Sequence, residues 1–173
     1  CSGLVGSEMC IRDRMWDSTQ DKFVATGCCA RIEDYQRLPD DRMKILTIGE
    51  KRFRVLDTVR EKPYLVGLVE LIEDVPSEKE LGELAYQVDI LLKDVVRLSG
   101  KLMGHQIELP EDIPTLPKEL SYWVASNLYG VATEQQALLE MQNTAARLER
   151  EVEILTSTRN HLAARTVLKD TLT

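Results

Sequence analysis

The sequence has few aromatic residues and no apolar run long enough to cross a membrane. Phe, Trp and Tyr together make up 5% of the chain, which has two Phe and two Trp. It therefore lacks the basic patches with interleaved aromatic rings that bind single-stranded nucleic acid. The net charge of −7 also argues against nonspecific binding to nucleic acid. The composition predicts neither a nucleic-acid partner nor a membrane partner.

The sequence also lacks the common signatures of catalysis. A P-loop needs Gly, then four residues, then Gly-Lys-Ser/Thr. The one Gly-Lys pair is Gly100-Lys101, but Val95 stands where the first Gly should be and Leu102 follows the Lys. No HExxH, GxSxG or CxxC motif occurs. We therefore predict that the chain is not an enzyme and uses no cofactor.

Histidine and cysteine are too scattered to predict a metal site. His105 and His161 lie far apart in the sequence, and each is expected to be a surface or capping residue. Cys28 and Cys29 are adjacent in an expected strand, so their side chains should point to opposite faces, with one of them packed inward. A vicinal disulfide or a reactive thiol is the alternative. Two cysteines without further ligands do not form a zinc site.

Residues 38–74 have the pattern of an antiparallel β-meander. Pro39 and the aspartates that follow it predict a turn. Gly49-Glu50 separates two β-rich runs, residues 43–48 and 51–59, and predicts a two-residue hairpin. Residues 64–71 are apolar on both faces, which is typical of a strand buried on both sides. Within residues 51–59 the pattern predicts one apolar and one charged face, formed by Phe53 and Val55 and by Arg52 and Arg54.

After Pro76 the apolar pattern becomes helical. Ser77 and Glu80 fit a capping box, and Gly104 is a plausible helix end. A connector with three prolines follows, and a second helix is expected from near Pro117 to Gly130. The residues expected to face inward from this second helix are Leu120, Trp123, Val124 and Leu128.

A last helical region is predicted to open with a second capping box at Thr133 and Gln136, with a break at Asn143-Thr144. Its apolar residues follow a three-four spacing that Arg159 interrupts. This spacing is compatible with a dimeric coiled coil, but fewer than three uninterrupted heptads favour a helix packed on its own bundle. The apolar residues are Leu138, Met141, Ala145, Leu148, Val152 and Leu155, and the face predicted to be solvated holds Arg147, Glu149, Arg150, Glu151 and Glu153.

The motifs of residues 38–70 resemble the N-terminal LON domain of Lon proteases. The helical segments 119–130 and 134–170 are similar to the stand-alone LON-domain proteins of cyanobacteria and plastids. The resemblance implies an α+β fold, with a PUA-like β subdomain over residues 15–75 and a helical bundle with a long C-terminal helix over residues 76–173. It also implies the cytoplasm of a cyanobacterium or a plastid stroma. The β motif consists of Leu38, Pro39, Asp40, Arg42, Gly49, Arg52, Phe53, Arg54, Val55, Pro63, Tyr64, Val69 and Glu70.

Residues 1–14 are expected to be foreign to this domain. Residues 8–13 can be encoded by GAG ATG TGT ATA AGA GAC, a sequence that resembles a transposon end used in sequencing-library preparation. We expect this segment to be a disordered artefact. On this hypothesis, strands that normally precede Trp16 are missing, and one sheet edge is exposed.

The resemblance implies a non-catalytic module that binds unfolded or damaged polypeptide segments, and it leaves open whether the partner is the client proteins or a separate protease. Two rival hypotheses stay open. One is a fragment of a full ATP-dependent Lon protease, and the other is a PUA-like RNA-binding protein that uses the cations of residues 51–62. Oligomerisation through the C-terminal helix also stays open. The candidate peptide-binding residues, for which core packing is the alternative, are Phe53, Tyr64, Leu65, Tyr122, Trp123 and Tyr129.

Overall fold

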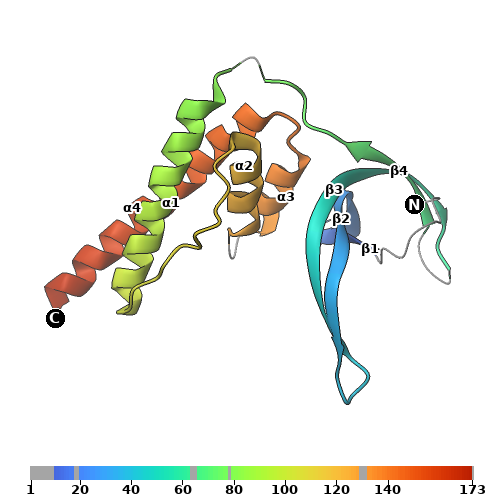
Figure 1. Ribbon diagram of the computed structural model, residues 1–173, viewed down its shortest axis with the longest axis horizontal. Helices are drawn as coiled ribbons and strands as arrows, with labels where there is room; N and C mark the ends of the chain where they lie inside the picture. The colour runs from blue at the N-terminus through green and yellow to red at the C-terminus, as the bar shows by residue number, and fades with distance from the viewer. Residues whose placement is uncertain (1–9, 18–19, 63–65, 78, 129–131, 173) are drawn as a thin grey trace. The chain divides into compact units, whose positions relative to one another are not determined.

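The computed structural model describes residues 10–17, 20–62, 66–77, 79–128 and 132–172. The chain divides into two compact units, Cys1–Glu73 and Asp74–Thr173. The described part of the first unit is an antiparallel sheet and that of the second is helical (Figure 1), so the predicted α+β class is confirmed.

The sheet unit is a meander in which each strand pairs with the next strand along the chain. The strand order is β1-β2-β3-β4, and all three pairings are antiparallel. The predicted meander is therefore confirmed, although its strands differ from those expected. The bounds are Cys10–Asp17 for β1, Lys22–Arg37 for β2, Met43–Arg60 for β3 and Val66–Ile72 for β4.

The expectation of disorder through residue 14 is wrong for residues 10–14. These residues belong to β1, in which Cys10 pairs with Arg31 and Arg14 pairs with Gly27. The Arg14 Nε also donates a hydrogen bond to the Val24 carbonyl, at 2.6 Å. A strand partner satisfies the backbone of this segment whatever the origin of its sequence.

The hairpin predicted at Gly49-Glu50 is also wrong, because β3 continues through these residues. Gly49 pairs with Ala30 and Lys51 pairs with Cys29, so Glu50 is the extra residue of a β-bulge. A Cβ atom on Gly49 would lie 3.2 Å from the Cys28 Sγ, a close approach that glycine accommodates. The long strand β2 pairs with β3 both before and after Gly49-Glu50, and this pairing overrides the local turn signal.

The turn that joins β2 and β3 is where the sequence predicts it. The Asp41 N–H donates to the Leu38 carbonyl at 3.2 Å, and the Leu38 N–H donates to the Arg42 carbonyl at 2.7 Å. Asp41 has a φ of 63°, which aspartate tolerates better than most residues. The five residues from Leu38 to Arg42 therefore reverse the chain between two long strands.

The prediction of a strand buried on both faces is wrong for β4. Leu68 and Leu71 are each 57% exposed, whereas Ile72 is buried. In the described sheet, β4 is an edge strand that pairs with β3 alone. An apolar run does not show whether another element covers it. An exposed edge strand can therefore have the same composition as a buried strand.

The helical unit is built on the long helices α1 and α4, which lie alongside each other (Figure 1). Its core includes Val88 of α1, Val124 of α2 and Leu148 of α4. The predicted inward positions Leu120 and Val124 are confirmed, with 3% and 1% of their surface exposed. The bounds are Leu81–Met103 for α1, Pro117–Ser126 for α2, Ala132–Glu140 for α3 and Thr144–Leu172 for α4.

The predicted end of α1 is confirmed, whereas the end of α2 differs. Gly104 has a φ of 77° and its N–H donates to the Gly100 carbonyl at 2.9 Å. The α2 helix ends at Ser126, and the predicted end at Gly130 lies outside the described residues.

Both predicted capping boxes are misplaced. The α1 helix begins at Leu81, and the Ser77 Oγ instead accepts the Lys79 N–H at 3.2 Å. Thr133 lies inside α3, which already begins at Ala132. Serine and threonine side chains form local turns as readily as helix caps, so the motif alone does not locate a helix start.

The predicted break before α4 is confirmed. The α3 helix ends at Glu140 and α4 begins at Thr144. The Asn143 side chain accepts the Ala146 N–H at 3.1 Å, which satisfies one of the free donors at the helix start. Leu148 and Leu155 of α4 are buried within the unit, so the bundle interpretation of the apolar stripe holds, and the dimer stays a prediction.

Candidate functional site

Three of the six residues predicted to bind peptide lie within the described part of the chain, one in the sheet unit and two in the helical unit. Phe53 lies in the sheet unit and is 2% exposed, so its side chain fits the core-packing alternative. Trp123 is partly buried against the core of the helical unit, and the Tyr122 hydroxyl donates to Asp74 at 3.0 Å. Tyr64, Leu65 and Tyr129 lie outside the described residues. The role of the set in peptide binding stays a prediction.

An exposed apolar surface lies on residues 32–37 of β2 and 43–48 of β3, next to the turn that joins these strands. We call residues 32–48 the β2–β3 arm. The pairing of β1 with β2 begins at Arg31, and that of β4 with β3 begins at Arg52. Within the described residues the arm is therefore a two-stranded ribbon with both outer edges unpaired, and it extends as a long hairpin (Figure 1).

The arm exposes large apolar side chains. Two-stranded hairpins are at best marginally stable in water, and soluble proteins rarely leave contiguous apolar surface open without a use for it. The exposed fractions are 59% for Tyr35, 58% for Met43, 39% for Ile45, 62% for Leu46 and 49% for Ile48.

The register distributes these side chains over both faces of the ribbon. Tyr35 lies opposite Ile45, and Met43 follows on the same face because side chains alternate along a strand. Leu46 and Ile48 point to the other face. Either face can therefore cover an apolar segment, and either edge can pair with an added strand.

Charged residues mark the tip of the arm. Arg37 pairs with Asp41 at 2.7 Å, and Arg42 pairs with Asp40 at 2.7 Å. The arginine beside Asp40 holds the pKa of that carboxyl below its ordinary value. These exposed pairs keep the turn polar, so the apolar surface is confined to the strands.

The helical unit contains a buried polar centre that the sequence pattern does not predict. Arg147 was assigned to the solvated face of α4, but its side chain is fully buried. Its guanidinium binds the Asp74 carboxylate through two nitrogens, at 2.8 and 3.2 Å, and lies 4.0 Å from the centre of the Tyr122 ring. Its Nε donates to the Ser121 Oγ at 2.7 Å. This centre joins Asp74, the first residue of the unit, to α2 and α4.

Glu151 is the second member of that face to be buried. The Ser121 Oγ donates to its Oε1 at 2.8 Å, whereas its Oε2 has no hydrogen-bond partner among the described residues. Burial raises the pKa of Glu151 to about 8, although the bond from Ser121 and the charge of Arg147 act in the opposite direction. The guanidinium is already bound to Asp74, so burial dominates and Glu151 holds a proton at neutral pH.

A signal for this burial was present in the sequence. Glu151 lies three residues after Leu148 and four before Leu155, both of which are buried, so it sits within the apolar stripe of α4. The rest of the predicted solvated face is at the surface. Arg150 pairs there with Glu134 at 2.6 Å.

The basic residues of β3 do not form one open patch. Arg52 is 6% exposed, and Arg54 pairs across the sheet with Glu70 at 2.9 Å. Two of the cations invoked for RNA binding are therefore engaged in the sheet itself, which weakens the RNA-binding hypothesis.

The described residues contain no group of three or more His, Cys, Asp or Glu placed to hold a metal ion. No vicinal disulfide joins Cys28 and Cys29, and both side chains are partly buried. None of the described helices is long and apolar enough to cross a membrane.

Comparison with known proteins identifies relatives over most of the chain. A sequence model of the ATP-dependent protease La (LON) substrate-binding domain matches residues 9–157. Lon protease 2 of Myxococcus xanthus is 33% identical over 138 residues, which are 79% of this chain and 17% of that protein. The Lon protease of Anaeromyxobacter dehalogenans is 32% identical over 138 residues, 79% of this chain and 16% of that protein. The chain thus spans about a sixth of the length of these relatives.

Two solved structures share the fold. A Lon N-terminal domain protein from Xanthomonas campestris superposes with a TM-score of 0.52 and 21% identity, covering 82% of this chain and 87% of that chain. The N-terminal domain of a Mycobacterium avium complex Lon protease has a TM-score of 0.53 and 16% identity, covering 86% of this chain and 90% of that chain.

Proposed function

The chain belongs to the LON substrate-binding domain family, and from this premise we propose that it binds unfolded polypeptide segments through the β2–β3 arm. The observation that carries the proposal is the set of five apolar side chains that the arm exposes on two strands whose outer edges have no partner strand among the described residues. A client segment buries these side chains and forms backbone hydrogen bonds with an arm edge. Binding of this kind is tolerant of client sequence, because backbone pairing and apolar contact need no particular side chain.

The proposed role is recognition without catalysis. The relatives named as proteases are about six times longer than the matched segment, so their proteolytic activity extends over sequence that this chain does not match. We propose that the arm holds a client for a Lon-type protease, which is either a separate protein or the remainder of the same polypeptide.

A pair of matched double variants tests the role of the arm. Ile45→Thr with Leu46→Thr reduces the apolar surface of the arm and keeps β-branched residues in the strand. Val167→Thr with Leu168→Thr makes a similar change on α4, where Leu168 is also 62% exposed, like Leu46. The readout is the Kd for a labelled, permanently unfolded casein, measured by fluorescence anisotropy.

The arm variant should bind the client about tenfold more weakly or worse, because each substitution removes about 1 kcal/mol of half-buried apolar contact. The α4 variant should bind within about twofold of the wild type. Equal affinity of the arm variant and the wild type would show that clients bind elsewhere. Circular dichroism of both variants checks that the fold is kept.

A further inference from the structure

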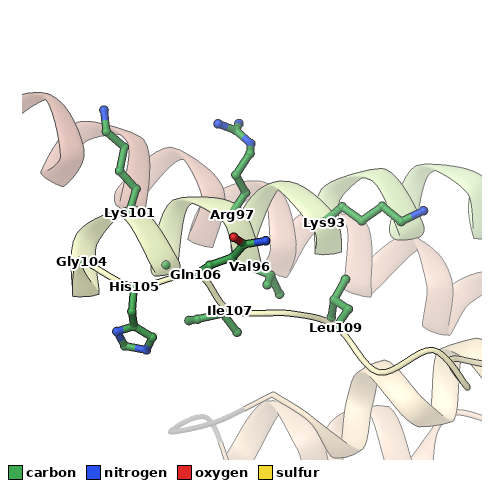
Figure 2. A pocket seen from close by; sticks show the side chains of 10 residues that line it. Lys93, Val96, Arg97, Lys101, Gly104, His105, Gln106, Ile107 and Leu109 are labelled. Carbon is green, nitrogen blue, oxygen red and sulfur yellow. The ribbon is translucent and has the colours of Figure 1, made fainter.

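The helical unit contains a pocket that is separate from the β2–β3 arm. It has a volume of about 570 Å³ and lies between α1 and the connector that follows Gly104. This volume is in the range typical of ligand sites. Figure 2 shows Lys93, Arg97 and Lys101 following one another along α1, with residues 104–109 running beside the helix.

The lining of the pocket is positively charged around an apolar part. The three cations are spaced by four residues, so they lie on one face of α1. Val96, Ile107 and Leu109 supply the apolar part, and Val96 and Leu109 also pack against the core of the unit. The pocket therefore offers an apolar surface between α1 and the connector, and the side chains of Arg97 and Lys101 extend from α1 on the side away from the connector (Figure 2).

Close packing at one glycine holds the connector against α1. A Cβ atom on Gly100 would lie 2.8 Å from the His105 carbonyl oxygen and 3.3 Å from the Ile107 nitrogen. The His105 N–H also donates to the Gly100 carbonyl at 3.2 Å. The connector wall is thus fixed to the helix by backbone contact, which gives the pocket a defined shape.

The cations of the pocket have weak local partners. Lys93 pairs with Asp89 at 2.6 Å, and Arg97 pairs with Asp94 at 3.0 Å, both within α1. The side chains of Lys93 and Arg97 are 62% and 68% exposed. Exposed pairs of this kind contribute little and are screened by salt, so a carboxylate brought in by a ligand can compete with them.

We propose that this pocket is a second polypeptide subsite, which takes an apolar side chain flanked by acidic residues. The proposal rests on the proposed function in that the ligand is a polypeptide, but it assigns a different surface and a charge preference. Charge complementarity selects carboxylates at the row of cations, and the apolar lining takes an aliphatic side chain between them. Nucleic acid fits less well, because the lining has no Phe, Tyr or Trp ring for stacking.

Two labelled peptides and two variants test this proposal. One peptide has leucines flanked by glutamates, and the other has glutamines in place of the glutamates. The pocket variant carries Lys93→Gln, Arg97→Gln and Lys101→Gln. The control variant changes the same net charge in the sheet unit, with Lys22→Gln, Lys51→Gln and Lys62→Gln. All six positions are exposed, so both variants should fold, and circular dichroism checks that they do.

The wild type should bind the glutamate peptide about tenfold more tightly than the glutamine peptide, and this preference should shrink from about 50 to about 300 mM salt. The pocket variant should lose the preference, while the control variant should keep it. If both variants lose the preference for the glutamate peptide equally, net charge explains that preference and the subsite is overturned. A structured RNA that displaces the glutamate peptide would assign the pocket to nucleic acid and overturn it as well.

The same measurements separate this inference from the proposed function. If the pocket variant loses the charge preference and still binds unfolded casein, while the arm variant loses casein, both proposals stand. If the arm variant keeps casein binding and the pocket variant loses the glutamate peptide, the arm proposal fails and the subsite stands. If the wild type binds casein and shows no preference between the peptides, the subsite alone fails.

Discussion

Replacement of Glu151 by glutamine should change how the stability of the helical unit depends on pH. Burial raises the pKa of Glu151 from 4.5 to about 8. The folded unit therefore keeps the proton up to about pH 8, whereas the unfolded chain releases it near pH 4.5. Between these values the unfolded state binds fewer protons, so the free energy of unfolding falls as the pH rises.

The expected size follows from the two pKa values. The slope approaches about 1.4 kcal/mol per pH unit, and the stability contributed by this one group falls by about 3 to 4 kcal/mol from about pH 5 to about pH 8. Glutamine resembles the protonated carboxyl in shape and charge and does not titrate. Glu151→Gln should therefore have nearly the stability of the wild type at the acid end and become the more stable protein at the alkaline end.

Urea denaturation followed by far-ultraviolet circular dichroism measures this difference, because the helical signal reports the unit that contains Glu151. Glu153→Gln is the control, since this carboxyl is on the same helix with 66% of its side chain exposed. The difference between Glu151→Gln and the wild type should change with pH, and a larger change than Glu153→Gln gives would assign the effect to the buried carboxyl. A constant difference for Glu151→Gln from about pH 5 to about pH 8 would refute the buried, protonated state.

Two further perturbations follow from the same unit. Arg147→Met should cost about 3 to 5 kcal/mol, because it leaves the buried Asp74 carboxylate without its cation, and adding Asp74→Asn should recover part of that loss in urea denaturation. Gly100→Ala should lower the thermal midpoint by an amount equivalent to about 1 to 3 kcal/mol, because the new methyl group meets the His105 carbonyl. Gly82→Ala should instead raise the midpoint slightly, because a Cβ atom on Gly82 of α1 would meet no atom of another part of the chain within 4 Å.

The sequence predicts those turns and helix ends that depend on a few consecutive residues. Gly104 ends α1 because glycine adopts a positive φ without strain, and the Leu38–Asp41 turn forms because proline and aspartate favour it. The Asn143-Thr144 break is local in the same sense. Each of these features depends on a few consecutive residues, so the sequence shows it directly.

Features set by distant partners could not be predicted in this way. Gly49-Glu50 has the sequence of a turn, and only the pairing of β2 with β3 on both sides of it shows that the strand continues. Arg147 reads as a surface cation because its partner Asp74 is 73 positions away in the sequence. The candidate site shows the same limit. The family resemblance pointed to Phe53, which is buried, whereas the exposed residues of the arm, such as Leu46, are ordinary strand residues whose exposure depends on where the neighbouring strands end.

The anchoring of Asp74 has a mechanical consequence. Asp74 is the residue at which the chain enters the helical unit, and its carboxylate accepts hydrogen bonds from Arg147, Tyr122 and Thr144. The next residue, Val75, donates its N–H to the Gln142 carbonyl at 2.8 Å. Tension along the backbone from the sheet unit is therefore distributed over the hydrogen bonds of Asp74 and Val75 before it acts on α1. A force applied along the backbone at Glu73 would therefore act on these bonds before it acts on the helix that begins at Leu81.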